Sequence, residues 1–210
     1  MDKSNQAIAV FDKRATDYQS RYMDVSNYHD TLDALCEALQ PDARVLELAC
    51  GPGNMTRYVL DKRPDLKISG SDLAPNMVAL AKINNPEADF CVMDMREIHQ
   101  LDEKYDCIIC GFGLPYLSKV ETLALLSRMQ TVLHPGAMVY LATMEGDYET
   151  SRVQKSSDGV DAIFIHYHQA DYLIDTLETA GFEIIAKKSQ AFPQNNDTDL
   201  ILIAKWNPKL

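Results

Sequence analysis

The first forty positions carry apolar residues at the spacing of an α-helix. These residues recur every three or four positions: Ile8, Phe11, Ala15, Tyr18, Leu32, Leu35, Cys36 and Leu39. Such spacing places the apolar side chains on one helical face. Pro41 ends the stretch, because proline does not continue a helix. The pattern therefore predicts helices over residues 4–39.

From residue 43 onward, short apolar runs alternate with helical patterns. The strand-like runs cover 43–49, 66–72, 88–94, 105–110 and 136–143, and helices are predicted to begin near 54, 75 and 119. Strands that are apolar throughout, each followed by a helix, are typical of a parallel sheet covered on both faces. The pattern predicts a doubly wound α/β fold.

The last third of the chain has a different pattern. Residues 144–160 are polar and predict a loop or excursion, 162–168 resemble a strand, and the helix predicted over 169–180 ends at Gly181. The strands predicted at 182–192 and 199–206 are joined by a connection too short for a parallel crossover. We therefore expect a mostly parallel sheet whose last strand runs antiparallel.

Charge and hydropathy narrow the class of protein. The 210 residues include 20 Lys and Arg against 31 Asp and Glu, giving a net charge of −11, which repels a phosphate backbone. No apolar run approaches the roughly 20 residues that span a bilayer, and the first residues, MDKSNQAIAVFDKR, lack the apolar region of a secretory signal. We expect a cytoplasmic protein that does not bind membranes, and the net charge disfavours a nucleic-acid partner.

The five cysteines have the pattern of small buried hydrophobes. They are odd in number and mostly lie in apolar runs: Cys36, Cys50, Cys91, Cys107 and Cys110. Cys107 and Cys110 form a C-x-x-C, but they flank two isoleucines in a strand rather than opening a helix, where a redox pair has its reactivity. No second pair of ligands at zinc spacing is present, so no metal site is predicted.

The first predicted strand runs into a glycine-rich segment, Glu47 to Asn54, with the sequence ELACGPGN. Glycines at such a position allow a tight turn and close approach of a ligand. Three details disfavour a pyrophosphate: Thr56 stands where the third glycine of a dinucleotide loop would be, Pro52 lacks an N–H, and Glu47 adds a carboxylate. A cationic ligand suits this loop better.

Acidic residues end the next two strands. Asp72 is placed to accept hydrogen bonds from a ribose diol, although it is equally explained as the N-cap of the helix that begins at Pro75. Asp94 can accept a hydrogen bond from an exocyclic amine such as that of adenine. The carboxyl ends of parallel strands meet at one edge of a sheet, so these residues predict a nucleoside site there.

These motifs resemble those of the class I S-adenosylmethionine-dependent methyltransferases, in the small-molecule branch of the type 11 and 25 families. The motifs are VLELACGPGN (45–54), SDLAPNM (71–77), CVMDM (91–95), YDCIICGFGLPYL (105–117) and LHPGAMVYLATME (133–145), within a resemblance covering about 40–206. The resemblance implies S-adenosyl-L-methionine as cofactor and a Rossmann-like methyltransferase fold with a doubly wound, seven-stranded, mostly parallel sheet whose last strand is antiparallel. It implies a cofactor site formed by Tyr18, Glu47, Ala49, Gly51, Gly53, Asp72, Leu73, Met77, Asp94, Met95, Cys110, Gly111 and Phe112.

The resemblance also implies how the chain is divided. Residues 1–40 would form an N-terminal helical lid and 41–210 the cofactor-binding domain, with 144–168 as an excursion over the substrate site. The stretch Gly113-Leu114-Pro115-Tyr116 lacks the polar residue and second proline found in enzymes that methylate amines of bases or glutamine amides. We therefore expect transfer to O, N or C of a small molecule.

Two segments would roof the acceptor site, residues 4–39 and 144–168, and we call them the roof segments. Candidate acceptor-site residues are aromatic or ionisable and lie in these segments or near them. They are Tyr18, Tyr22, Tyr28, His29, Tyr116, Tyr148, His166, Tyr167 and His168, together with Arg21 and Arg152 for a substrate carboxylate. His166, His168 and Tyr116 are the catalytic candidates, a histidine being a general base for an oxygen acceptor. For the two histidines, an ordinary strand end with solvated imidazoles is favoured over a catalytic role.

Two other functions stay open at this point. One is a tRNA or protein methyltransferase that recognises its partner through added surface, and the other is a module that binds an adenosine ligand without turnover. The acceptor, the catalytic base and the oligomeric state do not follow from the residues. A homodimer is one option for the assembly.

Overall fold

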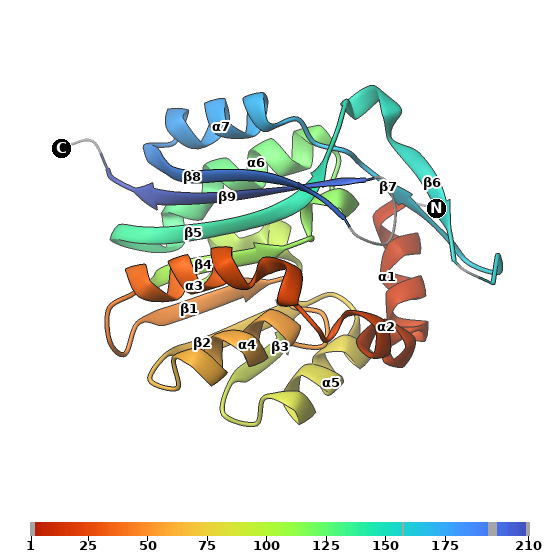
Figure 1. Cartoon of the computed structure of the whole chain (residues 1–210), viewed down its shortest axis with the longest axis horizontal. Helices are drawn as coiled ribbons and strands as arrows, with labels where there is room; N and C mark the ends of the chain where they lie inside the picture. The colour runs from red at the N-terminus through yellow and green to blue at the C-terminus, as the bar shows by residue number, and fades with distance from the viewer. Residues whose placement is uncertain (1–2, 157, 193–196, 209–210) are drawn as a thin grey trace.

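A computed structural model of the chain describes residues 3–156, 158–192 and 197–208 (Figure 1). The predicted spans 1–40, 144–168 and 41–210 include positions outside these ranges, and those positions are not described. Within the described ranges, no helix is long and apolar enough to cross a membrane.

The main sheet has seven strands in the order β3-β2-β1-β4-β5-β9-β8. The strands are β1 (Arg44–Leu48), β2 (Lys67–Asp72), β3 (Asp89–Val92), β4 (Tyr105–Gly111), β5 (Leu133–Glu145), β8 (Phe182–Ala191) and β9 (Thr198–Trp206). The first five run parallel, and β9 is antiparallel to both β5 and β8. The predicted sheet, including its reversed last strand, is confirmed.

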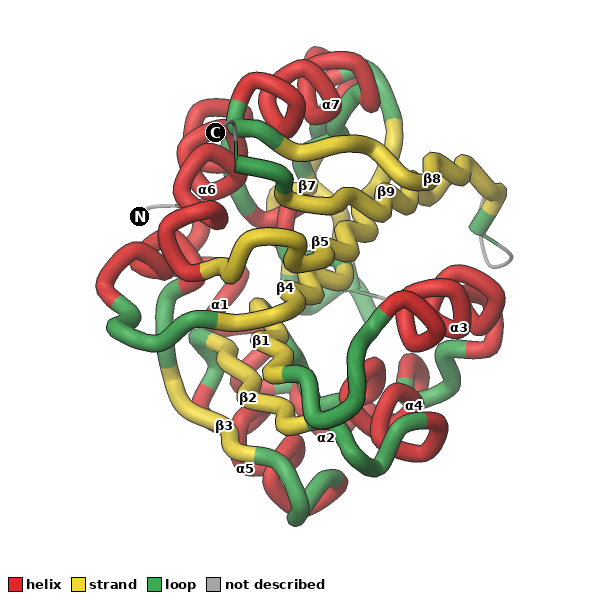
Figure 2. The backbone as a smooth tube through the Cα atoms, turned by 90° about the vertical axis from the view of Figure 1, so that its left-hand side faces the viewer, coloured by secondary structure: helices red, strands yellow, loops and turns green. Residues whose placement is uncertain are grey.

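Helices cover both faces of the sheet. The α-helices are α1 (Lys3–Lys13), α2 (Ala15–Tyr22), α3 (His29–Ala38), α4 (Asn54–Lys62), α5 (Pro75–Asn84), α6 (Lys119–Met129) and α7 (Ala170–Thr179). Short 3-10 turns are η1 (Ser26–Tyr28), η2 (Met95–Gln100), η3 (Leu114–Tyr116), η4 (Gln130–Val132) and η5 (Tyr148–Thr150). Figure 2 shows α6 and α7 on one side of the strands and α3 and α4 on the other.

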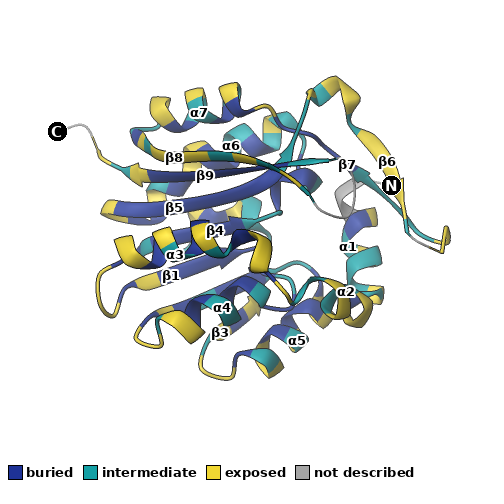
Figure 3. Cartoon of the chain, viewed as in Figure 1, coloured by how far each residue is buried: buried dark blue, intermediate teal, exposed yellow. Residues whose placement is uncertain are grey.

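Alternation along the central strands builds a core on each face. Leu46 and Ile108 pack with residues of α6 and α7, whereas Val45 and Ile109, their sequence neighbours, pack with residues of α3 and α4. Successive side chains of a strand point to opposite faces, so strands that are apolar throughout fill both cores. Figure 3 shows these central strands as buried along most of their length.

Two predictions on the chain's later part need correction. The predicted strand at 162–168 is only β7 (Ala162–Ile165), and it pairs antiparallel with β6 (Arg152–Lys155) in a separate two-stranded sheet. The strand β6 lies inside the predicted polar loop, and all four of its residues are exposed (Figure 3). A polar strand gives no alternation to detect, because neither of its faces is buried. The β6–β7 hairpin lies beside α1 (Figure 1).

The cysteine prediction also needs one correction. Cys36, Cys50, Cys107 and Cys110 are buried, as predicted, but Cys91 is exposed. Cys91 lies on β3, the edge strand of the main sheet. An edge strand has less covering than a central one, so apolar character in the sequence did not guarantee burial there.

Candidate functional site

The glycine-rich segment after β1 is a loop held in left-handed conformations. Ala49, Gly51 and Gly53 have φ of 52°, 53° and 77°. A Cβ on Gly53 would lie 2.3 Å from the side-chain nitrogen of Asn85, so this glycine permits close packing of the loop on α5. Gly51, in contrast, faces open space that Tyr18 borders, since its added Cβ would lie 3.7 Å from a Tyr18 ring carbon.

Asp72 ties the end of β2 to this loop. One carboxyl oxygen accepts a hydrogen bond from the Gly51 N–H at 2.9 Å, and the other accepts one from the Ala74 N–H at 2.9 Å. Burial raises the pKa of Asp72. The N-cap residue of α5 is Ala74, so the N-cap interpretation of Asp72 is wrong by two positions. The carboxylate organises the loop that borders the site.

A cavity of about 100 Å3 lies where the ends of β1, β2, β3 and β4 meet the N-terminal helices. Ten of the thirteen residues predicted for cofactor binding line it: Tyr18, Ala49, Gly51, Asp72, Leu73, Met77, Asp94, Met95, Gly111 and Phe112. Further lining residues that sequence reasoning missed come from α1 and η2 and include Ile8, Phe11 and Arg96. We call this space the nucleoside cavity.

Asp94 is already engaged at the rim of the nucleoside cavity. Its carboxylate accepts hydrogen bonds from the Arg96 guanidinium, the shortest at 2.6 Å, and Arg96 also bonds Glu121 at 2.6 Å. The two carboxylates raise the pKa of Arg96. Arg96 is not among the residues predicted from the sequence, although it stands two positions after Asp94, the predicted adenine contact.

The three other predicted cofactor residues lie behind the cavity wall. Gly53 packs on α5, and Cys110 is fully buried in β4. Glu47 is 2 % exposed and accepts a hydrogen bond from the Thr56 hydroxyl. Burial raises the pKa of Glu47 to about 7. None of the three lines the nucleoside cavity or the larger one beside it.

A second cavity of about 450 Å3 adjoins the first, and we call it the acceptor cavity. Seven residues line both spaces: Phe11, Tyr18, Ala49, Gly51, Gly111, Phe112 and Tyr116. The further lining residues include members of α2, η1, α4, β5, the β6–β7 hairpin and the start of β9. Both predicted roof segments therefore contribute to this space.

Aromatic rings from the roof meet at the junction of the two cavities. The Phe11 ring lies edge-on to that of Tyr116 at 4.8 Å between centroids and to that of Tyr18 at 5.8 Å, and Tyr18 lies 4.6 Å from Tyr22. Burial raises the pKa of Tyr18 and of Tyr116, so both hydroxyls stay protonated at neutral pH. They can donate a hydrogen bond there.

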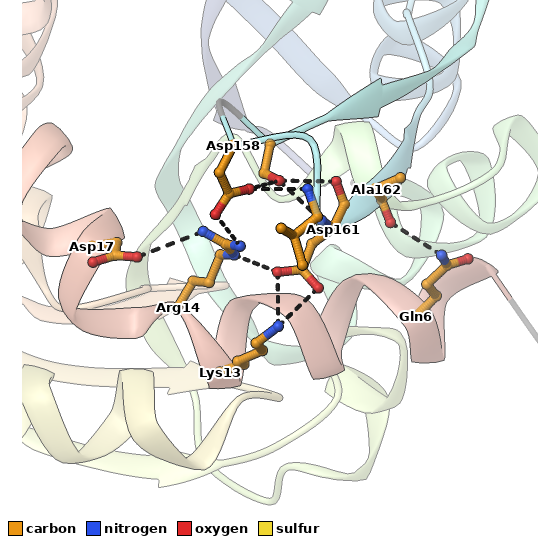
Figure 4. Close-up of polar contacts among 9 residues, drawn as sticks. Gln6, Lys13, Arg14, Asp17, Asp158, Asp161 and Ala162 are labelled. Carbon is orange, nitrogen blue, oxygen red and sulfur yellow. Dashed lines mark hydrogen bonds and ion pairs between the residues drawn. The ribbon is translucent and has the colours of Figure 1, made fainter.

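Ion pairs fasten α1 to the β6–β7 hairpin. Arg14 lies between Asp158, at 2.7 Å, and Asp161, which also accepts from the Lys13 ammonium at 3.0 Å (Figure 4). The Gln6 amide donates to the first carbonyl of β7 at 3.1 Å. These contacts join segments separated by more than 140 positions and close one wall of the acceptor cavity.

Among the candidate acceptor-site residues, the structure separates two groups. Tyr18, Tyr22, Tyr28, Tyr116 and Arg21 line the acceptor cavity, whereas His29, Tyr148, His166, Tyr167, His168 and Arg152 do not. His29 stacks on Tyr58, and Arg152 pairs with Asp197 at 3.2 Å.

The two catalytic histidine candidates are buried structural residues. His166 is 8 % exposed and His168 is fully buried, so the interpretation of solvated imidazoles is wrong. The Nε2 atom of His168 lies 2.9 Å from the Leu114 carbonyl, and its Nδ1 atom bonds the Tyr172 hydroxyl. Burial lowers the pKa of His168 to about 4. No cluster suited to a metal ion is found among the described residues.

Asp199 is the most buried carboxylate in the acceptor-cavity wall, and sequence reasoning missed it. It lies near the start of β9, is 3 % exposed, and accepts a hydrogen bond from the Tyr28 hydroxyl at 2.7 Å. The available signal was an acidic residue directly before the apolar run Leu200 to Ala204. Such a residue is out of place in a buried strand unless it has a partner.

The chain is similar in sequence to known methyltransferases. Residues 45–136 match the methyltransferase domain family. A putative methyltransferase of Invertebrate iridescent virus 6 is 28% identical over 165 residues, 76% of this chain and 58% of that protein. The trans-aconitate 2-methyltransferase of Variovorax paradoxus is 32% identical over 97 residues, 46% of this chain and 37% of that enzyme. The chain thus spans little more than half of the viral relative and less of the bacterial one.

Among solved structures, the magnesium protoporphyrin IX methyltransferase of Synechocystis with bound S-adenosylhomocysteine superposes with a TM-score of 0.75. The match covers 98% of this chain and 100% of that one at 17% sequence identity. This likeness shows that the two chains share their fold.

Proposed function

We propose that this chain is a class I S-adenosylmethionine-dependent methyltransferase and that it methylates a small-molecule acceptor. The match of residues 45–136 to the methyltransferase domain family supports the class I resemblance drawn from the sequence motifs, and the small-molecule branch is part of the proposal. The cofactor is S-adenosyl-L-methionine, whose sulfonium supplies an electrophilic methyl group when bound.

One observation carries the proposal: two adjoining cavities share seven lining residues at the carboxyl ends of the strands. Open α/β sheets bind their ligands at this edge. The nucleoside cavity holds ten of the predicted cofactor residues, and the acceptor cavity is enclosed by the roof segments. A cofactor and an acceptor seated in the two spaces would meet at Gly111, Phe112 and Tyr116.

The residues present suit a cationic nucleoside. Asp72 would hold the ribose hydroxyls, Leu73 and Met77 would contact the adenine, and the Met95 backbone would meet its amine beside the Asp94–Arg96 pair. The carboxyl of Asp72, which lines the nucleoside cavity, would favour a positive charge on the ligand there. The aromatic junction excludes water, so that positioning of the two reactants supplies most of the rate.

Transfer to a nucleic acid is disfavoured by the charges of the acceptor cavity. Its lining includes Asp24, Asp161, Asp197 and Asp199, against the cationic Arg21 and Lys155. An anionic wall repels a phosphate backbone. A histidine base is disfavoured as well, because His166 and His168 line neither cavity.

Isothermal titration with S-adenosylhomocysteine tests the proposal, with NAD as a parallel control. We expect micromolar binding of the former and none of the latter. The same protein is then supplied with methyl-labelled cofactor and a panel of small acceptors. Binding of NAD in preference to S-adenosylhomocysteine would contradict the assignment of the nucleoside cavity.

A further inference from the structure

A buried hydrogen-bonded pair, Tyr28 and Asp199, forms part of the acceptor-cavity wall and belongs to none of the cofactor contacts. Tyr28 comes from the short turn η1 in the roof and Asp199 from β9, 171 positions away in the chain. The two residues are 7 % and 3 % exposed. Their side chains line the acceptor cavity but not the nucleoside cavity.

The Tyr28–Asp199 pair lies next to the junction where the two cavities meet. The ring of Tyr28 packs on that of Phe112, with centroids 5.3 Å apart, and Phe112 lines both cavities. Asp199 pairs in register with Met144 of β5, another lining residue. The carboxylate therefore stands beside the place where a nucleophile would meet the methyl group.

Tyr28 is itself held rigidly. The Thr31 hydroxyl donates to the Tyr28 carbonyl at 2.9 Å and lies 3.0 Å from the hydroxyl of Tyr140. Burial and the bond to Asp199 raise the pKa of Tyr28, so the phenol remains a donor. Burial also raises the pKa of Asp199, which makes this carboxylate a stronger base than an exposed one.

We infer that Asp199, oriented by Tyr28, accepts the proton of the methyl acceptor, and that the acceptor presents a hydroxyl or amine hydrogen on an aromatic ring. This inference rests on the proposed methyl transfer. The cavity has an aromatic lining formed by Phe11, Tyr18, Tyr22, Tyr28, Phe112, Tyr116 and Phe192.

The step balances without a further reactant. The lone pair of the acceptor oxygen or nitrogen forms the new bond to the methyl carbon, and the carbon–sulfur bond breaks with its electrons going to sulfur. The sulfonium becomes a neutral thioether. The proton of the acceptor moves to the Asp199 carboxylate, which later releases it to solvent.

This chemistry separates the chain from relatives with acidic acceptors. The trans-aconitate of the Variovorax enzyme's name is a carboxylate, which needs no base and would be repelled by a buried anion. The acceptor cavity also carries Asp24, whereas its Asp197 pairs with Arg152, and Arg21 and Lys155 lie elsewhere in its lining. A carboxylate acceptor is therefore the class disfavoured at the part of the wall that Asp199 forms.

Three ring compounds of similar size test the inference: phenol, aniline and benzoate. Each is offered with methyl-labelled S-adenosylmethionine to the full chain, and its binding to the protein loaded with S-adenosylhomocysteine is followed by saturation-transfer NMR. We expect phenol or aniline to bind and be methylated, and benzoate to do neither. The first two arms distinguish an oxygen from a nitrogen acceptor.

Variants then locate the effect. Asp199→Asn should lower kcat by about 100-fold or more while changing KM by less than about threefold, because a general base acts in the chemical step. Tyr28→Phe should lower kcat by about tenfold, since it removes one hydrogen bond to a charged group. Asp30→Asn, which removes an exposed carboxylate of α3, is the control and should retain the activity of the unmodified chain.

The pH profile gives an independent readout. In the unmodified chain, kcat/KM should fall as acid protonates Asp199, and this fall should disappear in Asp199→Asn. Tyr28, Asp197 and Tyr140 are the titratable groups that act on this carboxyl within the described residues. The two tyrosines have pKa values raised by burial and stay neutral across the acid range.

The outcomes separate this inference from the proposed function. Unchanged S-adenosylhomocysteine affinity in every variant, together with the expected kcat losses, supports both. Methylation of benzoate, an Asp199→Asn variant within threefold of the unmodified kcat, or binding of S-adenosylhomocysteine with no binding of phenol or aniline overturns the inference alone. Loss of S-adenosylhomocysteine binding by the unmodified chain overturns the proposed function.

Discussion

The nucleoside cavity and the acceptor cavity adjoin each other but are assembled in different ways. The nucleoside cavity draws mainly on the ends of successive parallel strands, and Asp72 fixes its glycine loop through backbone hydrogen bonds from Gly51 and Ala74. The acceptor cavity is closed by segments more than 140 positions apart, joined by side-chain ion pairs such as Arg14 to Asp158. The nucleoside cavity is thus shaped by hydrogen bonds to the backbone at the edge of the sheet, and the acceptor cavity by contacts between side chains of distant segments.

Because of this difference, cofactor affinity and entry to the acceptor cavity should depend on different residues. Backbone hydrogen bonds within a packed sheet edge hold the nucleoside side in a fixed shape. Ion pairs between exposed side chains contribute little and are screened by salt. We therefore expect substitutions near the strand ends to have large effects on stability and cofactor affinity. Substitutions at the contact between α1 and the β6–β7 hairpin should have small effects, seen as faster amide hydrogen exchange in α1.

The largest effect should come from Glu47, beneath the glycine loop. Burial raises its pKa from 4.5 to about 7, so between these pH values the folded chain keeps a proton that the unfolded chain has lost. Stability consequently falls as pH rises through this window. Glu47→Gln removes this titration. The difference in unfolding free energy between the variant and the unmodified chain should therefore shift in favour of the variant by on the order of 3 kcal/mol as the pH rises from 4.5 to 8. Urea unfolding at the two pH values measures this.

The exposed Glu37 of α3 supplies the control for that experiment. Glu37→Gln should unfold with the same pH profile as the unmodified chain. A stability difference for Glu47→Gln that does not change with pH would show that Glu47 ionises in the folded chain as it does in the unfolded one.

A somewhat smaller effect is expected for Asp72, measured on cofactor binding. Asp72→Ala removes the proposed ribose acceptor together with the hydrogen bonds that hold Gly51 and Ala74. We expect S-adenosylhomocysteine affinity to fall by roughly 1.5–3 kcal/mol, as for a lost charge-assisted hydrogen bond. Asp61→Ala, which removes an exposed carboxylate of α4, is the calorimetric control. Equal affinities in the two variants would remove Asp72 from the site.

The smallest effect should appear at the roof contact. Arg14→Ala breaks the ion pairs with Asp158 and Asp161 and should speed amide hydrogen exchange in α1 by about two- to fivefold, while exchange in β1 and β4 stays the same. Molar salt should reproduce the change in the unmodified chain. Arg57→Ala, on α4, removes an arginine from another pair of carboxylates. Faster exchange of α1 in that control would mean that the Arg14 contacts have no specific role in fastening the roof.

Much of the nucleoside side could be predicted from the sequence, because its residues are set by local rules. A glycine loop after an apolar strand and an acidic residue at the next strand end lie close together in any parallel sheet. Ten of thirteen predicted residues line the nucleoside cavity. Glu47, Gly53 and Cys110 do not, because they face the packed side of the same elements.

For the acceptor cavity, the sequence predicted which chain segments would surround it but not which of their residues would line it. The sequence indicated that the helices near the N-terminus and the stretch after β5 would roof the site, but it pointed to His166 and His168, which are buried behind the wall. Side-chain direction past the end of β7 depends on contacts with Leu114 and Tyr172 from other elements. Local spacing carries no information on such contacts.

The sequence by itself determined the sheet, its reversed last strand and the glycine loop, since hydrophobic periodicity and turn residues act over a few positions. Only the tertiary structure decided that Tyr28 and Asp199 are hydrogen-bonded, that Arg96 pairs with Asp94, and that ion pairs hold the β6–β7 hairpin against the end of α1. The Tyr28–Asp199 contact joins residues 171 positions apart, so packing of the intervening elements sets its geometry. The sequence thus determines the fold and half of the site, while the acceptor's environment is a product of the folded chain.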